Sequence, residues 1–104
     1  MDNPLISIII PVYNAGEHSK KCLDSVIHQT WRNLEILLID DGSTDGSGDL
    51  CDEYAARDKR ITCLHQVNSG VSKARNAGIR LAKGDYYHFL DGDDYIKEDT
   101  YEYL

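Results

Sequence analysis

Three carboxylates lie within four residues near the end of the chain, at Asp91, Asp93 and Asp94. They follow the aromatic and apolar segment 86–90, whose composition is typical of a short strand. Acids crowded at a strand end repel one another, and a divalent cation with oxygen ligands is the simplest partner that removes the repulsion. Gly92 permits a tight turn that directs two carboxylates to one point. The alternative is a solvated acidic turn at the start of a helix.

Apolar segments alternate with amphipathic helical patterns along the rest of the chain. The strands are predicted at 5–10, 34–39, 61–66 and 86–90, with the first expected to stop at Pro11. The helix between the first two strands is expected to end at Arg32 and Asn33, and Ser43 or Thr44 is expected to cap the next helix. The predicted buried stripes of the three helices are Cys22, Leu23, Val26 and Ile27; Leu50, Cys51, Tyr54 and Ala55; and Val71, Ala74, Ala77 or Gly78, and Leu81.

Strand and helix thus alternate three times before a last strand. This order predicts an α/β fold with a mostly parallel sheet and helices on both of its faces. In such sheets ligands bind beyond the carboxyl ends of the strands. Four polar segments follow the predicted strands and are therefore expected to meet at one edge, namely 11–14, 40–45, 68–70 and 91–94.

Composition narrows the classes of function. The chain has 104 residues, enough for one domain, and its net charge of −7 argues against binding to nucleic acid or to an anionic membrane surface. Cys22, Cys51 and Cys63 lack metal-ligand spacing and are expected to be reduced core residues, and the four histidines are expected to be structural. The apolar segment 5–10 is too short for a signal or membrane span, so a cytoplasmic location is expected, with membrane association of a longer protein left open.

Other motifs compete with the metal hypothesis. The loop after the first strand lacks the glycine patterns of dinucleotide-binding and P-loop proteins. Residues 41–52 carry acids at spacings similar to those of a calcium-binding EF-hand loop, although Gly48 occupies a position that favours an apolar residue. A receiver-like phosphoacceptor site, with Asp40 and Asp41 paired at a strand end, is another alternative.

Taken together, five motifs resemble those of family 2 glycosyltransferases of the GT-A fold. They are SIIIPVYN at 7–14, SV with QTW at 25–31, EILLIDDGSTD at 35–45, NSGVSKARNAGI at 68–79 and FLDGDD at 89–94. The resemblance spans nearly the whole chain. It implies a Rossmann-like nucleotide-binding half of a GT-A domain, covering residues 1–104, and a hexosyltransferase type of activity with inversion at the anomeric carbon.

The resemblance also implies roles for individual residues in binding a nucleotide-diphosphate-sugar donor, expected to be UDP-linked. Asp41 accepts a hydrogen bond from the base, Asp93 is the main ligand of Mn²⁺ or Mg²⁺, and Asp91 reaches the ribose or the metal. Pro11, Tyr13 and Asn14 line the base and ribose. Lys73 helps to hold the donor or pairs with nearby acids instead.

The resemblance leaves the catalytic base unassigned, because that residue is expected beyond Leu104. The chain is therefore expected to bind donor and metal without transferring sugar, and to be part of a longer enzyme acting on a glycan or lipid-linked acceptor in cell-surface polysaccharide synthesis. A non-catalytic nucleotide- or phosphate-binding module is the competing class. The strand at 86–90 is expected to leave an open sheet edge through which the chain self-associates.

Overall fold

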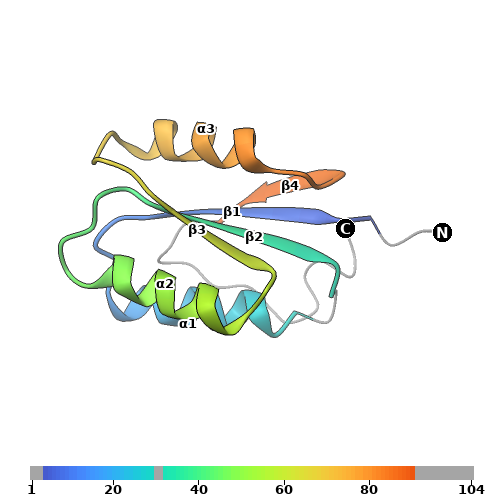
Figure 1. The fold of residues 1–104 in the computed structure, drawn as a ribbon, viewed down its shortest axis with the longest axis horizontal. Helices are drawn as coiled ribbons and strands as arrows, with labels where there is room; N and C mark the ends of the chain where they lie inside the picture. The colour runs from blue at the N-terminus through green and yellow to red at the C-terminus, as the bar shows by residue number, and fades with distance from the viewer. Residues whose placement is uncertain (1–3, 30–31, 91–104) are drawn as a thin grey trace.

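A sheet of four parallel strands forms the centre of the computed structural model, which describes residues 4–29 and 32–90 (Figure 1). The strand order is β3-β2-β1-β4. The elements are β1 (Ile6–Val12), α1 (Glu17–Ile27), β2 (Leu34–Asp40), α2 (Ser47–Arg57), β3 (Ile61–His65), α3 (Val71–Leu81) and β4 (Tyr86–Phe89). Helices α1 and α2 cover one face of the sheet and α3 covers the other (Figure 1). The predicted α/β architecture is confirmed.

Both faces of the central strands are buried, because successive side chains of a strand point to opposite faces. Ile8 and Ile10 pack in the larger core cluster with residues of α1 and α2. Ile9 lies on the other face, in a smaller cluster with Ala74 and Ala77 of α3. All three isoleucines are completely buried. The continuous apolar run that predicted a strand covered on both sides is thus explained.

Strand β1 continues through Pro11 to Val12, so the predicted stop at Pro11 is wrong. In a parallel sheet the N–H groups of alternate residues point to the same neighbouring strand. The Ile9 carbonyl accepts a hydrogen bond from the Leu90 amide at 3.0 Å, which places Ile9 and Pro11 on the β4 side. Among the described residues, the pairing of β4 with β1 reaches Ile9, so Pro11 lies beyond this ladder and its missing N–H removes none of the ladder's hydrogen bonds.

The helix boundaries also differ from those predicted. Helix α1 ends at Ile27, before Arg32 and Asn33. The residue that precedes α2 is Gly46 in a left-handed conformation, with no side-chain cap, so Ser43 and Thr44 do not cap this helix. Both contact Asn14 instead, because they lie three and two residues too early to reach the first turn of α2.

Small residues bring α3 close to the sheet. Its buried positions are Ala74, Ala77 and Gly78, whereas the predicted core residues Val71 and Leu81 are 49% and 38% exposed. A Cβ placed on Gly78 would lie 2.3 Å from Cγ2 of Ile9. The helix therefore packs so closely that only small side chains fit at the centre of its contact with the sheet.

Replacing Gly78 with alanine is expected to destabilise the chain by about 1–2 kcal/mol in urea unfolding. Overpacking of this kind costs about 1–3 kcal/mol, and it outweighs the gain of about 0.5–1 kcal/mol that alanine brings to a helix interior. Ser72→Ala, at an exposed position of the same helix, is the control and is expected to change stability by less than about 0.5 kcal/mol. A Gly78→Ala chain as stable as the parent would contradict this packing.

Strand β4 is an edge of the sheet among the described residues, and it carries the exposed side chains of Tyr86 and Tyr87. Self-association through this edge stays a prediction. Within 4–29 and 32–90, no helix combines the length and apolar character that a membrane span requires.

Candidate functional site

Three of the four predicted polar segments meet at the carboxyl edge of the sheet. The backbone N–H of Asn14, after β1, donates to Ser43 Oγ at 3.1 Å, and the Asn14 side-chain carbonyl accepts the Thr44 N–H at 2.7 Å. Asp41, after β2, accepts hydrogen bonds from the amides of Ser69 and Gly70, which precede α3. The fourth segment, 91–94, lies outside the described residues. The loops after β1, β2 and β3 are therefore joined into one polar surface.

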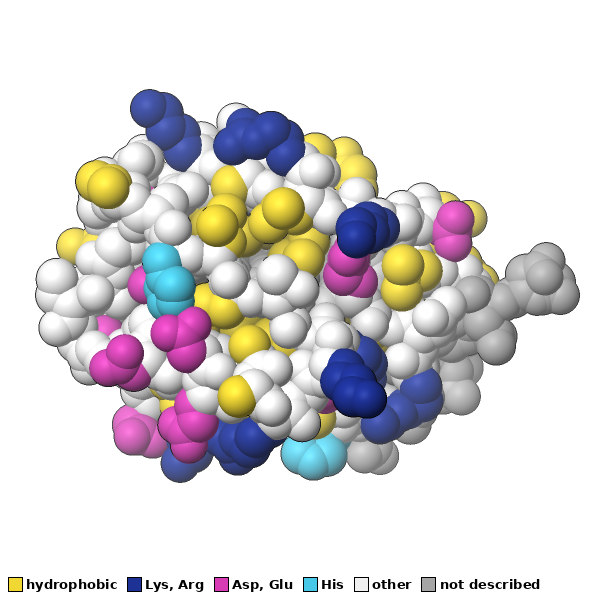
Figure 2. Space-filling view, in the orientation of Figure 1, with side chains coloured by type: hydrophobic (Ala, Val, Ile, Leu, Met, Phe, Trp, Pro, Cys, Tyr) yellow, Lys and Arg dark blue, Asp and Glu magenta, His cyan; other side chains and the backbone are white. Residues whose placement is uncertain are grey.

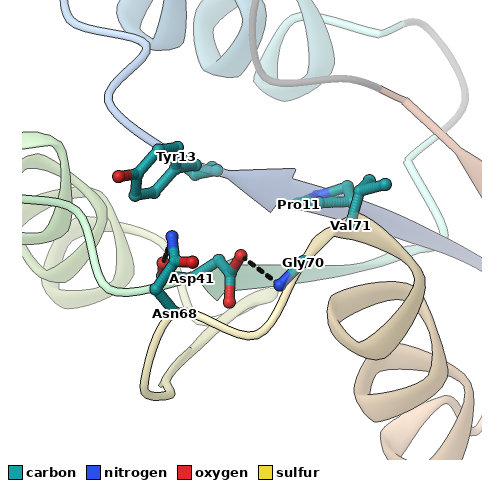
Figure 3. Close-up of a pocket in the computed structure, with 7 residues that line it drawn as sticks. Pro11, Tyr13, Asp41, Asn68, Gly70 and Val71 are labelled. Atoms are coloured by element: carbon teal, nitrogen blue, oxygen red, sulfur yellow. Dashed lines mark hydrogen bonds between the residues drawn. The ribbon is translucent and has the colours of Figure 1, made fainter.

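A cavity of about 300 Å³ opens between these loops. Figure 3 shows Asp41 at its centre, with Tyr13 and Pro11 on the β1 side and Val71 at the start of α3. The lining residues are Pro11, Val12, Tyr13, Asp41, Asn68, Gly70 and Val71. The cavity thus combines an exposed aromatic ring and apolar side chains with one buried carboxylate, which is a typical composition for a small-molecule site.

The Asp41 carboxylate is held in place by three donors. Its Oδ1 accepts from Gln66 Nε2 at 2.9 Å and from the Ser69 amide at 2.8 Å, and its Oδ2 accepts from the Gly70 amide at 3.0 Å. Burial by itself raises the pKa of Asp41, but these hydrogen bonds outweigh it and leave the pKa below its ordinary value. Asp41 is therefore charged at neutral pH, and Oδ2 accepts only one hydrogen bond from the described residues.

Glycine permits the close approach of the two loops around Asp41. Gly42 has φ of +76°, and a Cβ on it would lie 2.8 Å from the backbone nitrogen of Asn68. The Asn68 side-chain amide donates to the backbone carbonyl of Asp41 at 3.1 Å, and the backbone N–H of Gln66 donates to the backbone carbonyl of Asp40 at 2.9 Å. A side chain at position 42 would push these loops apart, so the shape of the cavity depends on this residue.

The residues that the sequence predicts to bind the nucleotide-sugar separate into two groups in the structure. Pro11, Tyr13 and Asp41 line the cavity. Asn14 does not line it, because its side chain is engaged by the loop after β2, and it adopts a positive φ of 49° there. Lys73 is exposed in the first turn of α3 and also lies outside the lining. Asp91 and Asp93 fall outside the described residues.

Four lining residues were not assigned from the sequence: Val12 at the end of β1, and the group Asn68, Gly70 and Val71 after β3. The available signal for the group after β3 was its position directly after the third predicted strand. Val71 was instead assigned to the helix stripe that packs on the sheet. It is exposed because α3 begins at the cavity rim, where its first residue faces the opening and not the core.

The two alternatives for the acids after β2 do not match the geometry. Helix α2 begins at Ser47, so residues 41–52 are not a continuous calcium-binding loop. Asp40 and Asp41 have separate partners, since Asp40 contacts His65 and Asp41 contacts the segment before α3. A receiver-like site requires these two acids to be paired, and here they are not.

A second polar group surrounds His65 at the end of β3, and the sequence did not predict it. Its Nδ1 lies 2.7 Å from Asp40 Oδ2 and its Nε2 lies 2.7 Å from Asp52 Oδ1. These two hydrogen bonds raise the pKa of His65 to about 9, so both ring nitrogens carry protons at neutral pH. Figure 2 shows acidic side chains gathered around a histidine on the α2 side of the visible face. His65 thus links β2, α2 and β3.

Comparison with known proteins gives consistent matches. The model for Glycosyl transferase family 2 matches residues 7–104. The uncharacterized glycosyltransferase EpsJ of Bacillus subtilis is 46% identical over 101 residues, which cover 97% of this chain and 29% of that protein. Glycosyltransferase GlyG of Streptococcus pneumoniae is 46% identical over 96% of this chain and 34% of its own length. The chain thus spans about a third of the length of these relatives.

Solved structures show the same fold. S. aureus TarS 1-349 in complex with UDP superposes with a TM-score of 0.86 and 30% identity, covering 93% of this chain and 30% of TarS 1-349. The mannosyltransferase PcManGT of Pyrobaculum calidifontis, in complex with GDP-Man and Mn²⁺, has a TM-score of 0.83 and 25% identity over 91% of this chain and 29% of its own.

Proposed function

The chain belongs to glycosyltransferase family 2, and we propose that it is the donor-binding part of an inverting enzyme that uses a UDP-sugar. The acceptor in this proposal is a glycan or a lipid-linked sugar. The chain itself binds the nucleotide and its metal ion, and a catalytic base is supplied by residues outside it. The relatives are glycosyltransferases of which this chain matches only about a third, which supports a partial role.

The observation that carries the proposal is the unfilled acceptor position on Asp41. A carboxylate accepts about four hydrogen bonds, and the described residues supply three to Asp41, with one of them on Oδ2. The unfilled acceptor position is therefore on Oδ2 of the charged Asp41 side chain, which lines the cavity. A base with a ring N–H at its pairing edge, such as uracil, supplies the missing donor.

The surroundings of Asp41 suit a nucleoside. Tyr13 is 53% exposed and lines the cavity beside Pro11, so it offers a flat apolar surface for a base or ribose. Complexes of TarS with UDP and with UDP-GlcNAc support a uridine nucleotide in this fold. Guanine also has a ring N–H, and PcManGT binds GDP-Man, so the base must be tested directly.

The diphosphate requires positive charge, which the chain as a whole lacks at a net −7. Asp91 and Asp93 are the proposed ligands of Mn²⁺ or Mg²⁺, because carboxylate oxygens are the ligands that these hard cations prefer. When bound, the ion neutralises charge on the nucleoside diphosphate that leaves during transfer. The last described residue before these acids, Leu90, is hydrogen-bonded to Ile9, two residues before Pro11 of the cavity.

Calorimetric titration with uridine, cytidine and guanosine tests the base preference. Uridine is expected to bind at least tenfold more tightly than cytidine, because the N3 of cytosine carries no proton at neutral pH and would face the Asp41 carboxylate as a second acceptor. Equal or tighter binding of cytidine would refute the role of Asp41. Binding of guanosine in preference to uridine would refute the assignment of UDP.

A further inference from the structure

We propose that Asp52, Cys63 and His65 form a binding site for a thiophilic divalent metal ion of the Zn²⁺ class, separate from the donor cavity. None of these residues lines the cavity around Asp41. Asp52 lies on α2, and Cys63 and His65 lie two residues apart on β3, so their side chains project from the same face of that strand. The inference does not depend on the identity of the donor.

The donor atoms lie close enough together to be shared by one ion. One oxygen, one sulfur and one nitrogen, from these three side chains, all lie within 4.8 Å of one another. The Cys63 Sγ is 3.6 Å from His65 Nε2. With Zn–N and Zn–S bonds of about 2.0 and 2.3 Å, a tetrahedral angle places nitrogen and sulfur about 3.5 Å apart, so this pair needs almost no adjustment.

The third donor needs a small movement that the structure permits. Asp52 Oδ1 is 2.7 Å from His65 Nε2, whereas tetrahedral zinc separates oxygen and nitrogen ligands by about 3.4 Å. The side chain of Asp52 is 57% exposed, so its carboxylate has room to withdraw by that amount. The ion would then replace the hydrogen bond between the two side chains with two metal–ligand bonds.

Asp40 supplies the support that metal-bound histidines commonly have. The other ring nitrogen of His65, Nδ1, lies 2.7 Å from Asp40 Oδ2, and the side chain of Asp40 is only 7% exposed. The Asp40 Oδ1 is held in turn by the Ser43 amide at 3.0 Å. A buried carboxylate on Nδ1 fixes the ring orientation and leaves Nε2 directed at the ion, as in carboxylate–histidine–zinc triads.

The mixed ligand set determines which ion fits. A thiolate and an imidazole select Zn²⁺ over Mg²⁺ or Mn²⁺, which prefer oxygen ligands alone. A hydrogen bond with the Cys51 thiol, together with burial, raises the pKa of Cys63, so the thiol is protonated in the metal-free chain. Binding therefore displaces one proton from Cys63 and one from His65, and water takes the fourth position on the exposed side.

Titration of the untagged, reduced chain with Co²⁺ tests the site, because Co²⁺ occupies zinc sites and reports its ligands by absorption. We expect tetrahedral d–d bands and a thiolate-to-cobalt charge-transfer band, both removed by a stoichiometric addition of Zn²⁺. No nucleotide is present, so the result is independent of donor binding. A folded chain that gives no thiolate band would overturn the proposal.

Two variants with matched controls assign the ligands. Cys63→Ser is expected to abolish the charge-transfer band, whereas Cys22→Ser, on α1, keeps it. Asp52→Asn is expected to weaken Co²⁺ binding at least tenfold, and Asp49→Asn, an exposed acid of the same helix, leaves it unchanged. Circular dichroism verifies folding of each variant. A band that persists in Cys63→Ser, or an affinity unaltered in Asp52→Asn, would refute the assigned ligands.

Discussion

Asp41→Asn is expected to weaken the binding of both uridine and UDP by about 10- to 150-fold. The change keeps the size of the side chain but removes its charge, and a hydrogen bond to a charged group contributes about 1.5–3 kcal/mol. The side-chain NH₂ of the new asparagine also replaces one carboxylate oxygen, which accepts a hydrogen bond from a backbone amide of the segment before α3 in the parent chain. The base therefore loses a charged acceptor, and the loop that forms the cavity wall loses a partner. Calorimetric titration of the two ligands measures the effect.

The control for this variant is Asp49→Asn, which removes the same charge from an exposed position of α2 outside the cavity. It is expected to bind uridine and UDP as the parent chain does. Thermal unfolding is measured for both variants, and their affinities are compared at a temperature below the unfolding temperature of each. A loss of affinity under these conditions does not come from loss of the fold. An Asp41→Asn chain with unchanged affinity for uridine would show that the base does not contact this carboxylate.

Asp93→Ala is expected to abolish the effect of Mn²⁺ on UDP binding. In the parent chain, chelation of the metal is expected to weaken UDP binding at least tenfold, because the diphosphate then approaches acidic groups without a neutralising ion. In the variant, affinity with Mn²⁺ and affinity with EDTA are expected to coincide at the lower value. Titration of UDP under the two conditions measures both chains.

Uridine is the matched ligand control for this second prediction, because it has the base and ribose but no diphosphate. Its binding is expected to be independent of Mn²⁺ and unaffected by Asp93→Ala. The two predictions are thus separable, since Asp41 acts on both ligands and Asp93 acts on UDP alone. If Asp93→Ala retains the full Mn²⁺ dependence, the ion has other ligands.

The sheet was predictable because its signal lies within short segments. The run at 5–10 is nearly continuous and β-branched, and the run at 34–39 is apolar except for Glu35, which identifies strands covered on both faces. Their alternation with helical patterns determines parallel pairing. The end of β1 was mispredicted, since the effect of Pro11 depends on how its side of β1 is paired. That side faces β4, a strand 75 residues or more further along the chain, and the pairing is not visible locally.

Part of the candidate site was also predictable from the sequence. Asp41 and Tyr13 follow strands, and topology alone brings strand ends together. Asn14 was placed with them for the same reason, but its side chain is used to join two loops, which depends on the length and turn of each. The group around His65 was missed because Asp40, Asp52 and Cys63 come from three elements and have no common spacing in the sequence.

The position of β1 in the sheet affects how the chain folds during synthesis. It is the first of the four strands in the sequence but lies between β2 and β4, and its pairing with β4 joins Ile6 to Tyr86. A nascent chain on the ribosome therefore cannot complete the pairing of its first strand until residues 86–89 have emerged. Until then one side of β1 stays available to other strands, so chaperone binding to stalled nascent chains should decrease sharply once β4 has left the exit tunnel.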